Sequence, residues 1–130
     1  GLTGLGLDGC GNVRTEGLCT VSGLTALTNL DIGANFNVTT EVLRAVSGLT
    51  ALTTLSLDRC SNVSTEGLCT VSRLTALTHL DLGANSNVTT EVLRAVSGLS
   101  ALTTLSLYYC YNVSTENPRR YRPCGTGIGS

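Results

Sequence analysis

The sequence predicts a single-domain α/β solenoid, in which a parallel sheet forms one face and short helices cover the other. Two observations carry this prediction. Segments that begin at residues 24, 49, 74 and 99 repeat one another every 25 residues. Within each segment, apolar and polar residues first alternate, as in a half-buried strand, and then follow a helical period.

Residues 74–98 display both halves of a repeat. Residues 77–83 alternate leucine with polar or small residues, which predicts the strand. A turn over 85–88 follows, and the helical half begins near Thr89. Gly98 is expected to stop that helix, because glycine is common just past a helix end.

Two versions of the repeat alternate, so the full period is 50 residues. One version carries asparagine at the turn after the strand, and the other carries cysteine. Residues 24–48 and 74–98 both belong to the first version and differ at only three positions. Residues 1–23 match a partial copy, so the array is expected to cover 1–116. Residues 117–130 contain two prolines and break the pattern, which indicates an irregular C-terminal cap or tail.

The pattern Leu-x-x-Leu-x-Leu-x-x-Asn/Cys stands at 27–35, 52–60, 77–85 and 102–110. It resembles the leucine-rich repeat family, and the resemblance covers residues 2 to about 116. The copies with cysteine are similar to the cysteine-containing subclass. The resemblance implies a right-handed arc with the parallel sheet on its concave face and the short helices on its convex face.

Composition and motifs argue against several classes of protein. Eight Lys and Arg stand against nine acidic residues, whereas nucleic-acid binding needs a basic face. No apolar run approaches the roughly 18 residues of a membrane span, and no segment resembles a signal peptide. His79 is the only histidine, and no nucleophile, phosphate loop or zinc spacing accompanies it. We therefore expect neither an enzyme nor a cofactor nor a metal site, and neither nucleic acid nor a membrane as partner.

The concave strand face is where we expect a protein partner to bind, because its side chains vary while the leucine frame stays fixed. This surface is small, polar and mildly acidic, and Tyr108 is its aromatic anchor. The sequence thus predicts a non-enzymatic protein-binding module. The candidate contact residues are Asn29, Asp31, Thr54, Ser56, Asp58, His79, Asp81, Thr104, Ser106 and Tyr108.

Two alternatives stay open at this point. Near-identical repeats and an uncovered N-terminal edge at Leu2 would suit a structural protein that stacks end to end into homo-oligomers or fibres. Ice binding is the other alternative, because threonines recur in columns with a strand spacing of about 4.8 Å. One such column contains Thr28, Thr53, Thr78 and Thr103.

The cysteines fall into two groups. Those at the turn position, of which Cys60 is one, are expected to lie inside the solenoid. Cys19 and Cys69 are expected to point outward from the helices, and with Cys124 they are candidates for disulfides or interchain links. A bridge between repeats would exceed disulfide reach, so an intramolecular one would lie within a repeat, such as Cys60–Cys69. Free thiols and a cytoplasmic location are slightly favoured over secretion.

Four Asn-x-Ser/Thr sequons recur in register, and they would be glycosylation sites if the protein is secreted. The repeat alone also explains them, because asparagine suits the turn and Thr or Ser suits the cap at the start of the helix. The four asparagines are Asn37, Asn62, Asn87 and Asn112.

Overall fold

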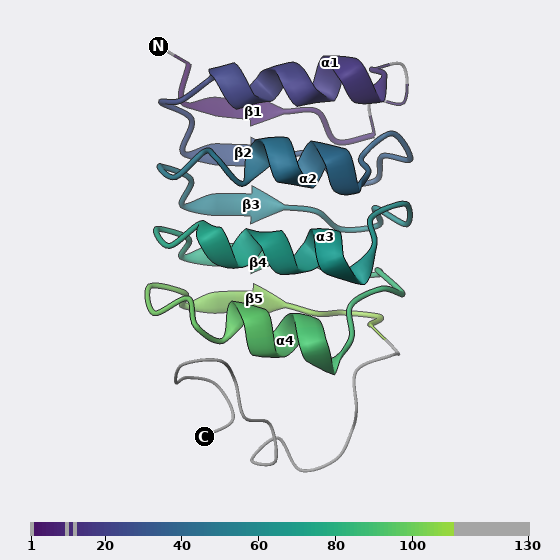
Figure 1. The fold of residues 1–130 in the computed structure, drawn as a ribbon, viewed down its shortest axis with the longest axis vertical. Helices are drawn as coiled ribbons and strands as arrows, with labels where there is room; N and C mark the ends of the chain where they lie inside the picture. Colours follow the sequence, from purple (N-terminus) through teal and green to yellow (C-terminus); the bar gives the residue numbers. More distant parts are fainter. Residues whose placement is uncertain (1, 10, 12, 111–130) are drawn as a thin grey trace.

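The computed structural model describes residues 2–9, 11 and 13–110, and it has the α/β leucine-rich-repeat architecture that the sequence predicts. Each repeat contributes one strand of three residues, and the strands form one parallel sheet in sequence order (Figure 1). Every residue of the first four strands pairs with the residue 25 positions later. The strands are β1 (Gly4–Gly6), β2 (Asn29–Asp31), β3 (Thr54–Ser56), β4 (His79–Asp81) and β5 (Thr104–Ser106).

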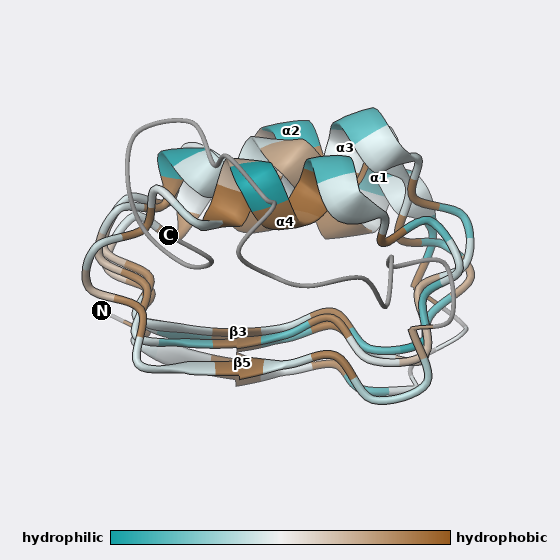
Figure 2. Ribbon diagram, turned by 90° about the horizontal axis from the view of Figure 1, so that it is seen from below, coloured by the Kyte–Doolittle hydropathy of each residue, from teal (hydrophilic) through white to brown (hydrophobic). Residues whose placement is uncertain are grey.

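The helices lie together on one side of the sheet, and their apolar sides face the strands (Figure 2). Two 3-10 helices, η1 (Thr20–Gly23) and η2 (Thr70–Arg73), continue the helices of the cysteine-containing repeats. In the part of the chain that is described, no helix has the length and apolarity needed to cross a membrane. The α-helices are α1 (Thr15–Cys19), α2 (Thr40–Val46), α3 (Thr65–Cys69) and α4 (Thr90–Val96).

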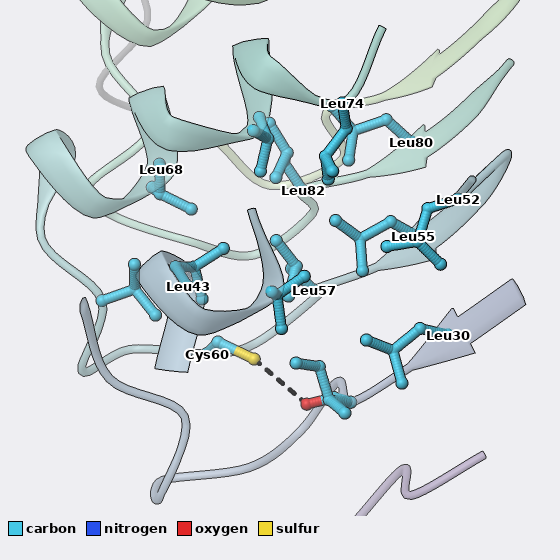
Figure 3. Packing of buried hydrophobic residues seen from close by; sticks show 14 of the residues in the cluster. Leu30, Leu43, Leu52, Leu55, Leu57, Cys60, Leu68, Leu74, Leu80 and Leu82 are labelled. Atoms are coloured by element: carbon cyan, nitrogen blue, oxygen red, sulfur yellow. Dashed lines mark hydrogen bonds between the residues drawn. The ribbon is translucent and has the colours of Figure 1, made fainter. Parts of the chain in front are cut away.

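Leucine columns fill the space between the two layers. In β3, Leu55 is 1% exposed, and the flanking Leu52 and Leu57 are fully buried. Helix residues such as Leu43 and Leu68 meet them from the other layer (Figure 3). Shortening one of these leucines to alanine is expected to cost about 2–5 kcal/mol, because buried apolar contacts are lost and a cavity is left.

The threonine column joins neighbouring repeats through the backbone. The hydroxyl of Thr28 donates to the carbonyl of Thr3 at 3.2 Å, and Thr53 donates to Thr28 at 3.2 Å. Thr78 and Thr103 continue the series at 3.1 and 3.0 Å, each to the threonine before it. These hydroxyl protons are committed inside the protein, which argues against the ice-binding alternative.

The sequon asparagines have a similar structural role. Asn37 Nδ2 donates to the carbonyls of Gly11 and Val13, at 3.0 and 2.7 Å. Asn87 Nδ2 donates to the carbonyl of Val63 at 2.6 Å, and Nδ2 of the exposed Asn62 donates to that of Phe36 at 2.7 Å. Each acceptor belongs to the preceding repeat. Asn112 lies outside the described residues. Glycosylation stays a prediction, but the nitrogen that would carry the glycan already joins two repeats.

The helix starts differ from expectation. The Ser64 side chain accepts a hydrogen bond from the backbone N–H of Gly67 at 3.1 Å, as a cap should. Thr39 and Thr89 make no side-chain cap bond, so the prediction of a threonine cap is wrong there. In that version the next threonine acts across repeats, since the hydroxyl of Thr40 accepts from the backbone N–H of Ser64 at 3.0 Å.

The turn position is internal, as expected. The thiol of Cys60 is fully buried and donates to the carbonyl of Ile32 at 3.4 Å (Figure 3), and burial raises its pKa to about 11. Its backbone N–H donates to Asn85 Oδ1 at 2.9 Å. The matching oxygen of Asn35 has no hydrogen-bond partner in the described part of the chain, which does not include the matching Cys10.

Cys19 and Cys69 are half-buried and pack against the core, so the expectation that they point outward is wrong. They behave as small apolar residues rather than like the exposed arginines at the same helix position. Burial, followed by nearby glutamates, raises the pKa of both thiols. Cys60 and Cys69 are both free, so the bridge within this repeat is not formed. Cys124 lies outside the described residues, as do residues 117–130 of the expected cap.

Candidate functional site on the sheet face

The strand residues that do not enter the core form the outer side of the sheet, which we call the sheet face. The register of 25 residues aligns these strand residues in two columns, and the second residue after each strand forms a third. All ten candidate contact residues lie in these columns and are exposed or half-buried. The first column is Gly4, Asn29, Thr54, His79 and Thr104; the second is Gly6, Asp31, Ser56, Asp81 and Ser106; the third is Asp8, Gly33, Asp58, Gly83 and Tyr108.

Glycines alternate with residues that carry larger side chains along the third column. Tyr108 lies over Gly83, so close that a Cβ added at Gly83 would collide with the tyrosine ring. Asp58 lies over Gly33 in the same manner, because a Cβ at Gly33 would collide with the carboxylate. Each glycine therefore provides the space into which the side chain of the following repeat leans. Asp58 and Tyr108 lie on this face as expected, but their dependence on the glycines was not predicted.

Asp58 is the centre of a polar cluster. Its Oδ2 accepts a hydrogen bond from the Tyr108 hydroxyl at 2.9 Å and lies 3.4 Å from Arg59 Nε. Its Oδ1 accepts from the hydroxyl of Ser56 at 3.0 Å. Tyr108 and Asp58 together raise the pKa of the exposed Arg59 above its ordinary value. Both carboxylate oxygens of Asp58 are thus engaged within the protein.

The residue after the third column turns the chain away from the sheet. Ala34, Arg59, Ala84 and Tyr109 all have φ between 52 and 57° there, in the left-handed region, and Gly9 has φ 69°. A non-glycine residue in this conformation costs of order 1 kcal/mol, which the surrounding repeats sustain. This backbone places the Tyr109 ring against that of Tyr108, edge to face, with ring centroids 5.5 Å apart.

Two further carboxylates are only partly engaged. Asp31 Oδ1 accepts from the backbone N–H of Gly33 at 3.1 Å, and Asp81 Oδ1 accepts from that of Gly83 at 2.9 Å. These bonds hold one oxygen of each carboxylate, and both residues are half-buried. Carboxylate oxygens of Asp8, Asp31 and Asp58 lie within 4.8 Å of one another. Because Asp58 is already bound by three protein groups, we assign no metal to this cluster.

His79 is exposed in the first column. Its Nδ1 hydrogen-bonds to the hydroxyl of Thr78 at 2.8 Å, which holds the imidazole against its own strand. This local contact is typical of a strand residue that faces solvent. His79 thus contributes an imidazole to the polar surface of the sheet face.

No protein-family model matches the sequence, and no curated protein matches it significantly. Solved structures do match. An internalin (inlF) from Listeria monocytogenes aligns over 75% of this chain and 30% of its own length, with 25% identity and a TM-score of 0.56. Internalin C2 of the same bacterium aligns over 78% of this chain and 50% of its own, with 20% identity and a TM-score of 0.51.

The chain therefore spans half or less of the length of these two internalins. Its five registered repeats, its parallel sheet with helices on one side and its likeness to internalins agree with one another. On these grounds the chain has the leucine-rich-repeat fold and is similar to the internalins.

Proposed function

We propose that this chain is a non-enzymatic protein-binding module that holds its partner on the sheet face. The likeness to internalins supports a protein-interaction module in general. The observation that carries the choice of face is the position of Tyr108, which is 36% exposed although its hydroxyl is bonded to Asp58 and its ring rests on Gly83. Such a ring offers contact area without losing rotamer freedom on binding, which favours affinity.

The surroundings of Tyr108 support the same surface. Tyr109 is 66% exposed and packs against its edge, and the exposed guanidinium of Arg59 lies beside Asp58. Tyrosine and arginine are over-represented among residues that carry binding energy at interfaces. The rest of the sheet face supplies small hydroxyl, amide and carboxylate groups that suit a polar rim.

The test is a comparison of two matched pairs of substitutions. Asn29→Lys with Thr104→Lys places two charges on the sheet face, and Thr50→Lys with Thr75→Lys places two at exposed positions outside it. The immobilised proteins are exposed to an extract of the cells that make the protein, and retained proteins are identified by mass spectrometry. We expect the sheet-face pair to lose partners that the other pair keeps. Partners that both pairs keep, or that both lose, would contradict the proposal.

Self-association is a second candidate. In the described residues β1 pairs only with β2, and the neighbouring Leu2 is 50% exposed. An open strand edge beside an apolar side chain is a surface on which a second copy can add. Light scattering across protein concentrations, with and without reductant, tests this. Growth that Leu2→Asp abolishes would support stacking at this edge, and a constant monomer mass would rule it out.

A further inference from the structure

The charged side chains are distributed unequally between the two layers of the molecule. Asp8, Asp31, Asp58 and Asp81 all lie on the sheet face, where Arg59 is the one guanidinium among the described residues. In the helical layer the described charges balance in number, because four glutamates in the first helical turns stand beside four arginines of the same layer. Those residues are Glu16, Glu41, Glu66 and Glu91, with Arg14, Arg44, Arg73 and Arg94.

The carboxylates of the sheet face are not equivalent. Asp58 is engaged by Ser56, Tyr108 and Arg59, so it holds the surface together. Asp31 and Asp81 each use only Oδ1, for a bond to a nearby backbone N–H. They occupy the same column two strands apart, which corresponds to about 10 Å at ordinary strand spacing.

We propose that the partner surface that binds the sheet face is basic, a protein or peptide segment rich in lysine or arginine. Asp31 and Asp81 pair with its cations, and the Tyr108 ring contacts the aliphatic part or the charge of a third cationic side chain. This inference rests on the proposed protein-binding function, which it makes specific in its chemistry. Charge complementarity carries it: the carboxylates outnumber the guanidinium on this face, whereas the helical layer is balanced.

The fixed geometry strengthens the argument. Asp31 and Asp81 are held by backbone amides, and Tyr108 is held by Asp58, so three contact groups are ordered before binding. Binding at this surface therefore costs less side-chain entropy than binding at a flexible surface. The same carboxylates repel phosphate groups, so the charge of this face favours a basic protein segment over nucleic acid or anionic lipid.

The test measures binding of a fluorescent oligo-lysine peptide by anisotropy at low and at physiological salt, with an oligo-glutamate peptide as the negative probe. Asp31→Asn with Asp81→Asn is compared with Glu41→Gln with Glu91→Gln. Both double variants remove two negative charges from the same two repeats, on opposite layers. Asparagine keeps an oxygen for the amide bonds that position residues 31 and 81, so the fold is preserved.

We expect the aspartate variant to bind oligo-lysine about three- to tenfold more weakly than the wild type, in line with two exposed ion pairs. The glutamate variant should bind like the wild type. Tyr108→Leu should also weaken the binding of oligo-lysine relative to the wild type, because the contact with the ring is lost. Equal weakening in both double variants, or no binding of oligo-lysine at low salt, would overturn the proposal.

Two outcomes separate this proposal from the function on which it rests. If partners are retained through the sheet face while oligo-lysine does not bind, the binding function stands and the basic partner is wrong. If oligo-lysine binds as expected while no protein partner depends on the face, the proposed function fails. Replacement of Arg119, Arg120 and Arg122, which lie outside the described residues, by alanine should leave binding unchanged. Tighter binding would identify this chain's own basic segment as the occupant and overturn the proposal.

Discussion

The hydroxyl of Tyr108 donates a 2.9 Å hydrogen bond to Asp58, a residue that lies 50 positions earlier in the sequence. The bond passes over the intervening strand, where Gly83 leaves space for the ring. Asp58 in turn leans over Gly33. The aromatic side chain of the third column is therefore positioned by two repeats other than its own.

Gly83→Ala should displace the Tyr108 ring and break its bond to Asp58. We expect a loss of stability of about 1–3 kcal/mol, the usual cost of overpacking, measured by urea denaturation. Gly6→Ala is the control, because a Cβ there meets nothing within 4 Å. In a Tyr108→Ala background the cost of Gly83→Ala should disappear. A cost that persists in that background would mean that the ring is not what the glycine accommodates.

Thr53→Val should remove one bond of the threonine column while keeping the shape of the side chain. The half-buried hydroxyl donates to the carbonyl of Thr28 at 3.2 Å, so its loss is expected to cost about 0.5–1.5 kcal/mol. The exposed Thr50, whose hydroxyl bonds to no described residue, provides the control substitution Thr50→Val. Equal denaturation midpoints for the two variants would contradict a structural role for the column.

Asn37→Ala should destabilise the protein more than Asn62→Ala. Asn37 is half-buried and donates to two carbonyls, whereas Asn62 is exposed and donates to one. We expect about 1–3 kcal/mol for the first and about half of that for the second, by thermal or chemical denaturation. If the protein is expressed through a secretory route, a glycan should be tolerated best at Asn62. The opposite order of stabilities would show that these bonds contribute little.

Stability should fall at alkaline pH because of Cys60. Burial raises the pKa of its thiol to about 11, whereas an unfolded thiol titrates near 8.5. The folded state thus holds the proton more strongly, so this contribution is complete below about pH 8.5 and is lost as the pH rises towards 11. The loss should reach about 3 kcal/mol.

Cys60→Asn is the matched control for this pH dependence, because asparagine occupies the same turn position in the alternate repeats. Unfolding free energies of the wild type and the variant should be measured by urea denaturation at pH 8 and pH 10.5. Their difference isolates the thiol from the other groups that titrate. A difference that does not change with pH would show that the Cys60 thiol is not buried as described.

The repeat fold could be predicted from the sequence because every repeat has the same length of 25 residues. Once Leu30 and Leu55 are placed in equivalent positions, parallel pairing and the side of the sheet on which Asp31 and Ser56 lie both follow. The same regularity placed all ten candidate contact residues on one face. Their role in binding stays a prediction, as do the domain boundaries, the use of the sequons and the location of the protein.

The contacts within the site could not be predicted in the same way. The bond between Tyr108 and Asp58 depends on the direction in which a side chain leans, and spacing alone does not give that direction. The place of Arg59 beside Asp58 was missed, because its left-handed backbone lies outside the strand pattern. A signal was present, since Gly33 and Gly83 alternate with larger residues in one column. The partial burial of Cys19 and Cys69 was not predicted, because the position of a residue on a helix does not show how closely a small side chain packs against the core.

The hydrogen bond between Tyr108 and Asp58, which crosses over Gly83, affects the cooperativity of unfolding. Strand pairing and helix packing in this solenoid join only adjacent repeats, so folding would propagate along it as in a one-dimensional chain whose ends fray first. Tyr108 and Asp58 add a link between second neighbours. The repeat that contains β5 therefore cannot open unless Tyr108 releases Asp58, which belongs to the repeat that contains β3. This link lengthens the unit that unfolds cooperatively. It also holds the Tyr108 ring in place when its own repeat fluctuates.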